Sequence, residues 1–82
     1  MIEEARKELM PLIEDFRKRM KEKGYPEGSI EKVLDMAEWD LQRRTVAIRD
    51  PEIRKKFEVE YFKDFLHRYE RWVEGFVKAL AE

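Results

Sequence analysis

Apolar residues recur along the chain at intervals of three and four positions, the pattern of amphipathic helices. The first such segment predicts a helix over roughly residues 2–23. Pro11 lies inside this segment, but at about 100° per residue it falls opposite the apolar stripe. We therefore predict one bent helix with Pro11 facing solvent, ended by Gly24 in a left-handed conformation and by Pro26. The residues expected on its buried face are Ile2, Ala5, Leu9, Leu12, Ile13, Phe16 and Met20.

A second helix is predicted over 29–49, with Ser29 as its N-cap because a serine hydroxyl accepts hydrogen bonds from the first free amides. Arg43, Arg44 and Arg49 fall near its C-terminus, where positive charge is favoured. The residues expected on its buried face are Ile30, Val33, Leu34, Ala37, Leu41 and Ile48.

The sequence Asp50-Pro51-Glu52 predicts the start of a third helix, over 51–81, since Asp caps helices and Pro is preferred at their first position. A heptad stripe follows, and aromatic residues widen it enough to cover two neighbouring helices. Ile53 and Phe57 fall outside this arc, which predicts a bend or a break near 57–59. The stripe and its widening consist of Val59, Phe62, Leu66, Tyr69, Val73, Phe76 and Leu80, with Tyr61, Phe65, Trp72 and Val77.

Three amphipathic helices joined by short connections predict an all-α fold, an antiparallel up-down-up three-helix bundle. The 82 residues make one domain, 1–82, because chains of this length do not divide into several. No segment shows the sustained alternation of a strand.

Charge and composition narrow the classes of function. Charged residues are 45% of the chain, but 18 Lys and Arg balance 19 Asp and Glu. A net charge of −1 argues against a protein that mainly coats nucleic acid or an anionic membrane. The absence of cysteine excludes disulfides, cysteine-based zinc sites and a thiol nucleophile. Without a long apolar run or a signal peptide at Met1–Glu4, we expect a cytoplasmic or recombinant soluble protein, neither secreted nor membrane-bound.

Catalytic groups are sparse. His67 is the only histidine, and it shares a polar helix face with Glu60 and Asp64, which could hold a metal only weakly. Ser29 already has a capping role, and no glycine-rich phosphate loop is present. We therefore predict a protein that is not an enzyme and has no cofactor, no metal and no small-molecule substrate.

Clustered basic residues provide an alternative function: a small nucleic-acid-associated protein of a thermophile that contacts phosphates. In an up-down-up bundle these clusters lie at two opposite ends instead of forming one stripe, and helix dipoles and nearby acids explain part of each. The candidate phosphate contacts are Arg17, Lys18, Arg19, Lys21, Lys23, Arg54, Lys55 and Lys56.

The leading hypothesis is a scaffold or a protein-binding module that presents a helix face. Trp39 and Val46 lie opposite the predicted core stripe, with Met36 and Arg43 beside them, and Trp, Met and Arg are enriched at interface cores. Alternatively, Trp39 packs on Arg43 or against Ile53 and Phe57. The edge residues Tyr61 and Trp72 either extend the patch or rim the core. The partner is another protein or a second copy of the chain.

The chain resembles computationally designed helical-bundle miniproteins. The resemblance lies in the near absence of Ser, Thr, Asn and Gln, the Gly24-Tyr25-Pro26 stop, the Asp50-Pro51-Glu52 start and the dense Glu, Lys and Arg surface. It implies a scaffold or an engineered binder of a chosen protein target, without enzymatic activity. Thermostable natural proteins share much of this composition, and Pro11 and the outward Trp39 depart from the design pattern.

Overall fold

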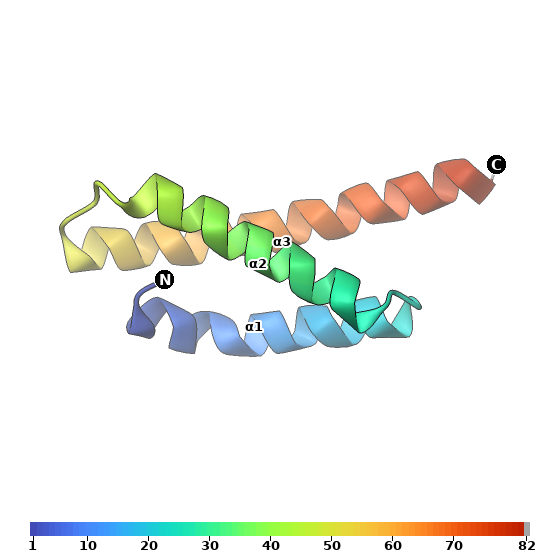
Figure 1. The fold of residues 1–82 in the computed structure, drawn as a ribbon, viewed down its shortest axis with the longest axis horizontal. Helices are drawn as coiled ribbons and strands as arrows, with labels where there is room; N and C mark the ends of the chain where they lie inside the picture. The colour runs from blue at the N-terminus through green and yellow to red at the C-terminus, as the bar shows by residue number, and fades with distance from the viewer. Residues whose placement is uncertain (82) are drawn as a thin grey trace.

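The computed structural model describes residues 1–81, and the side chains of residues 1–75, 79 and 80. Its helices are α1 (Glu3–Glu22), α2 (Glu27–Thr45) and α3 (Pro51–Ala81). They run up, down and up, with α2 crossing in front of the other two (Figure 1). The predicted all-α three-helix bundle is confirmed.

The core is a seam where α3 packs against both α1 and α2. Most residues of the three predicted stripes are buried there, because each helix turns its apolar face inward. Ile2, Ile13 and Val33 are only half-buried, and Leu12 is exposed at the edge of α1. The side chains of Phe76 and Val77 lie outside the described residues. The core consists of Ala5, Leu9, Phe16, Met20, Ile30, Leu34, Ala37, Leu41, Val59, Phe62 and Leu66, and Val73 is also buried.

The connection between α1 and α2 follows the sequence prediction. Gly24 has φ +90°, the left-handed conformation that glycine adopts without strain. Its amide donates to the Lys21 carbonyl at 2.9 Å, and the Tyr25 amide donates to the Met20 carbonyl at 3.2 Å. These bonds satisfy carbonyls at the end of α1. Pro11 lies exposed within α1, and the helix continues through it.

The predicted boundaries of α2 are wrong at both ends. Pro26 is the N-cap, with φ −61° and ψ 142°, and its carbonyl accepts from the amides of Ser29 and Ile30 at 3.1 and 3.2 Å. Ser29 therefore lies inside the helix, without a capping hydrogen bond. At the other end the helix stops at Thr45, which leaves Ile48 half-buried in the connection. Beyond the helix the chain turns, and the Ile48 amide donates to the Thr45 carbonyl at 3.0 Å.

The start of α3 is confirmed, because the Asp50 carboxylate accepts from the amides of Glu52 and Ile53 at 2.9 and 3.2 Å. The break near 57–59 is wrong: α3 is continuous, and Ile53 and Phe57 simply stay exposed outside the core arc. Leu80, expected in the core, is 72% exposed. The reason is length, because the 31-residue α3 extends beyond the α1–α2 connection, and Leu80 lies in the part that extends (Figure 1).

Candidate functional site

The outer face of α2 carries an exposed row of three apolar residues and one arginine, which we name the outer stripe: Met36, Trp39, Arg43 and Val46. Its members are spaced by three and four residues, so they line one side of the helix. The opposite side holds Ile30, Leu34, Ala37 and Leu41 in the core. Met36 is 65% exposed, Trp39 62% and Val46 79%.

Trp39 is held by its own helix. The Arg43 guanidinium lies over the indole, 4.9 Å from the ring centroid. The packing of Trp39 on Arg43, one of the two arrangements left open above, is therefore present, yet the ring remains mostly exposed. With Gln42 and Val46 the pair borders a shallow depression. Stacking fixes the orientation of both side chains and leaves an apolar surface ready for contact.

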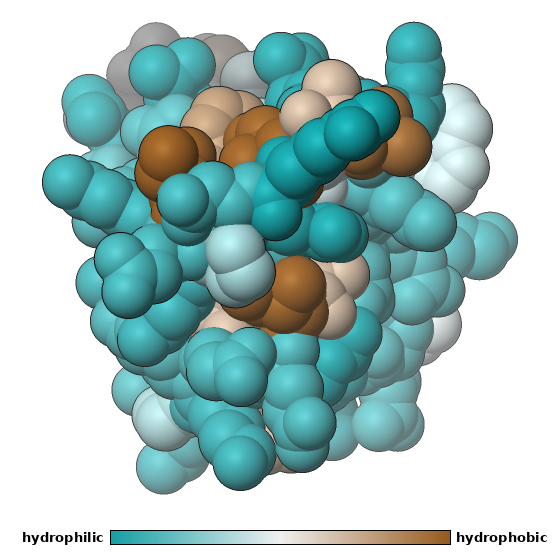
Figure 2. Space-filling view, turned by 90° about the vertical axis from the view of Figure 1, so that its left-hand side faces the viewer, coloured by the Kyte–Doolittle hydropathy of each residue, from teal (hydrophilic) through white to brown (hydrophobic). Residues whose placement is uncertain are grey.

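Apolar groups are also exposed beyond the Val46 end of the outer stripe. Figure 2 looks onto the end of the bundle that holds the α2–α3 connection and shows apolar side chains in its upper half and near its centre, among polar ones. Ile53, in the first turn of α3, is a large exposed apolar residue of this region, as is Val46 at the end of α2. Exposed apolar side chains therefore lie on both sides of the α2–α3 connection.

Tyr61 and Trp72 do not join the outer stripe. They belong to an aromatic row along α3, Phe57, Tyr61, Phe65, Tyr69 and Trp72, whose successive ring centroids are 6.1–6.4 Å apart. Tyr61 is half-buried beside α2, whereas Trp72 is 63% exposed. Both border a separate groove of about 460 Å³ together with Arg44, Asp64 and Arg68.

Three polar side chains connect α2 to α3 at the start of this groove. The Tyr61 hydroxyl donates to Asp40, the Arg44 guanidinium donates to the same carboxylate at 2.9 Å, and Arg44 also lies over the Tyr61 ring at 5.5 Å. The hydrogen bonds from Tyr61 and Arg44 lower the pKa of Asp40. Burial, followed by the bond to Asp40, raises the pKa of Tyr61. Arg44 compensates the negative charge of Asp40, and the bond from Tyr61 to Asp40 connects α3 to α2.

Most of the candidate phosphate contacts are engaged with carboxylates. Six of the eight form ion pairs, and the Arg19 guanidinium binds both oxygens of Glu70 at 2.6–3.0 Å. That hydrogen bond is the main cause of the lowered pKa of Glu70. Lys18 and Lys56 have no ion pair among the described residues. The other pairs are Arg17–Glu31, Lys21–Glu27, Lys23–Glu74, Arg54–Glu58 and Lys55–Glu8.

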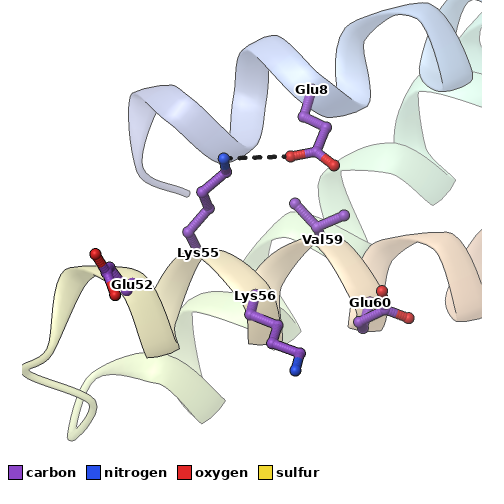
Figure 3. Close-up of a pocket in the computed structure, with 6 residues that line it drawn as sticks. All are labelled: Glu8, Glu52, Lys55, Lys56, Val59 and Glu60. Carbon is purple, nitrogen blue, oxygen red and sulfur yellow. Dashed lines mark ion pairs between the residues drawn. The ribbon is translucent and has the colours of Figure 1, made fainter.

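A depression of about 410 Å³ lies between α1 and the first half of α3. Figure 3 shows Lys55 reaching across it to Glu8, with Nζ 3.5 Å from the carboxylate, and Val59 turned toward α1. Lys56 and Glu60 point away from Glu8 on the other side of α3. Charges of both signs line the depression, so it offers neither a uniform field for an anion nor an apolar floor for a ligand.

A buried carboxylate was missed by the sequence analysis. Glu58 is 0% exposed and accepts from the Ile2 amide at 3.0 and 3.2 Å and from Arg54 Nε at 3.0 Å. The Met1 amino group lies 3.8 Å from it. Its spacing could have predicted its burial. Glu58 precedes the core residues Phe62 and Leu66 by four and eight positions, so it lies on the same face of α3.

Among the described residues, no group of three or more metal-ligating side chains is arranged around a common point. Glu60, Asp64 and His67 are each exposed on α3. None of the helices described is both long and apolar enough to cross a bilayer.

Comparisons of the chain with protein-family models, with curated proteins and with solved structures find no match.

Proposed function

We propose that this chain is a non-enzymatic helical bundle that binds a protein partner through the outer stripe of α2. The observation that carries the proposal is the exposure of Met36, Trp39 and Val46 on the side of α2 turned away from the core. Because burial of apolar surface is the main favourable term in protein association, such a surface gains free energy when a partner covers it.

The chemistry of the outer stripe supports a protein as its partner. Trp, Met and Arg are the residue types that most often form the centre of interfaces. The stacked pair of Trp39 and Arg43 is partly ordered before binding, which lowers the entropy lost on association. The resemblance to designed bundles stays a prediction, and it agrees with a chain built to present a helix face.

The pairing of the basic residues favours protein binding over phosphate binding. A cation that already holds a carboxylate must break that pair before it can neutralise a phosphate, and this reduces the electrostatic gain. Arg17, Arg19 and Arg54 each form such a pair within the bundle. The thermophile nucleic-acid protein therefore remains the weaker alternative.

The test compares two triple variants of the full chain. One removes the outer stripe, with Met36→Gln, Trp39→Gln and Val46→Gln. The control removes comparably exposed apolar residues that the outer stripe does not include, with Met10→Gln, Trp72→Gln and Leu80→Gln. Helical peptides selected by phage display on the unmodified chain should bind the stripe variant about tenfold more weakly and the control within about twofold.

Stability is the second measurement. Because the outer stripe lies outside the core, the stripe variant should unfold in urea within about 1 kcal/mol of the unmodified chain. A stripe variant that unfolds assigns Trp39 to the fold, and a selected pool that binds it as well as the unmodified chain places the binding surface elsewhere. Either outcome contradicts the proposal.

A further inference from the structure

The spacing of the outer stripe is the same in both directions along α2. Its four residues are separated by three, four and three positions, so the pattern is symmetric about position 41. Alternating steps of three and four are the spacing of a seam between two packed helices. A second α2 rotated by 180° would therefore present the same row of side chains in antiparallel orientation, as the matching surfaces of a two-fold dimer do.

The side chains that would meet in this arrangement are complementary. Met36 faces Val46 of the second copy, which covers one exposed apolar group with another. Trp39 faces Arg43 of the second copy, which adds a guanidinium to an indole that is 62% exposed. Each contact occurs twice, because the symmetry relates the two halves of the interface.

Polar residues beside the outer stripe fit the same register. The side chains of Asp35 and Gln42, both exposed, have no hydrogen bond or ion pair among the described residues, and neither does the side chain of Arg49 in the connection. The antiparallel pairing brings Gln42 next to Gln42 of the second copy and the Asp35 end next to the end that carries Arg49. On the other flank the charge of Asp40 is already compensated by Arg44, 2.9 Å away.

We propose that the outer stripe binds a second copy of this chain, with two α2 helices packed antiparallel about position 41. The inference rests on the proposed function and names its partner. One helix pair with four stripe residues on each side lies below the size of stable interfaces, about 1,200 Å². The dimer is therefore weak and depends on concentration. The two-fold contact is closed, so association stops at two copies.

The first experiment is sedimentation equilibrium of the full chain from micromolar to millimolar concentration. We expect a monomer–dimer equilibrium with a Kd of about 10–500 μM, as suits an interface of this size. The outer-stripe triple variant should be monomeric over the same range, while the control triple variant should dimerise like the unmodified chain.

The second experiment tests the register of the two α2 helices. The chain has no native cysteine, so only the introduced thiols can be linked. Gln42→Cys places a thiol next to its symmetry mate, whereas Asp35→Cys places two thiols about 20 Å apart along the paired helices. A short bis-maleimide should link the Gln42→Cys chain at least about fivefold faster than the Asp35→Cys chain. Adding Trp39→Gln to the Gln42→Cys chain should return the rate to that of Asp35→Cys.

The outcomes separate this inference from the proposed function. A chain that stays monomeric but still binds selected peptides through Trp39 overturns the second copy as partner and leaves the protein-binding surface in place. Equal linking of the two cysteine variants overturns the antiparallel register. Dimerisation that persists in the outer-stripe variant shows that another surface pairs, which overturns the inference, and the peptide measurement then decides on the proposed function by itself.

Discussion

Trp39 and Glu58 occupy positions opposite to those that their hydropathy suggests. The indole of Trp39 is 62% exposed on the outside of α2, whereas the carboxylate of Glu58 is fully buried where α3 meets the start of α1. Each has a partner that suits its position: Arg43 stacks on Trp39, and the Ile2 amide and Arg54 donate to Glu58. For these two residues the position on the helix, not the residue type, decides burial. Each side chain then needs a partner: a stacked group for the exposed ring, and hydrogen-bond donors for the buried carboxylate.

Substitutions on the two faces of α2 should show the largest difference in their effect on the stability of the chain. Leu41 is fully buried on the inner face, so Leu41→Ala removes core contacts and leaves a cavity; we expect a loss of about 2–5 kcal/mol in urea unfolding. Met36→Ala, on the outer face of the same helix, is the matched control and should change stability by less than about 0.5 kcal/mol. Similar losses for both would mean that the outer face also contributes to the fold.

The buried carboxylate gives the next largest effect. Glu58→Gln keeps the size of the side chain but places an amide donor among the donors of Ile2 and Arg54, so we expect a loss of about 1–3 kcal/mol. Glu60→Gln, exposed two residues further along α3, should be nearly neutral. Thermal unfolding of the two variants at neutral pH checks this, and a neutral Glu58→Gln would contradict the importance of the buried hydrogen bonds.

The smallest effect is a dependence on pH. Because Arg19 lowers the pKa of Glu70 in the folded chain, the pair contributes stability above the pKa of the unfolded carboxyl and loses it as pH falls through the folded value. Arg19 is half-exposed, so solvent screening keeps this contribution below about 1 kcal/mol.

Melting temperatures from pH 7 to pH 2.5 should therefore fall less in Glu70→Gln than in the unmodified chain. Glu22→Gln, at an exposed residue without an ion pair among the described residues, is the control and should keep the full pH dependence. An unchanged pH profile in Glu70→Gln would show that the pair contributes no stability.

Helix periodicity predicted the fold well, and local signals predicted the end of α1 and the start of α3. Gly24 and Asp50 act as expected because their conformations depend on neighbours in the chain. Ser29 was misplaced because α2 begins at Glu27, with the extended Pro26 as its N-cap, so Ser29 and Ile30 already donate their amides to the Pro26 carbonyl. Leu80 was misplaced because a heptad pattern shows which face is apolar but not whether a neighbouring helix reaches that far.

For the candidate site, the helical wheel placed Met36, Trp39, Arg43 and Val46 on one exposed face, which the structure confirms. It could not separate Tyr61 and Trp72 from them, because the rotation of α3 relative to α2 depends on packing between helices. It also missed the bond from Tyr61 to Asp40, which joins residues 21 positions apart.

The sequence by itself determined three amphipathic helices, the turn after α1, the start of α3 and the outward direction of Trp39, because periodicity and capping act within a few residues. Only the tertiary structure decided that Glu58 is buried, that basic residues such as Arg19 and Lys55 pair with carboxylates of another helix, and that the end of α3 extends past its neighbours. These features depend on the relative lengths and positions of helices that are distant along the chain, and no local pattern records them.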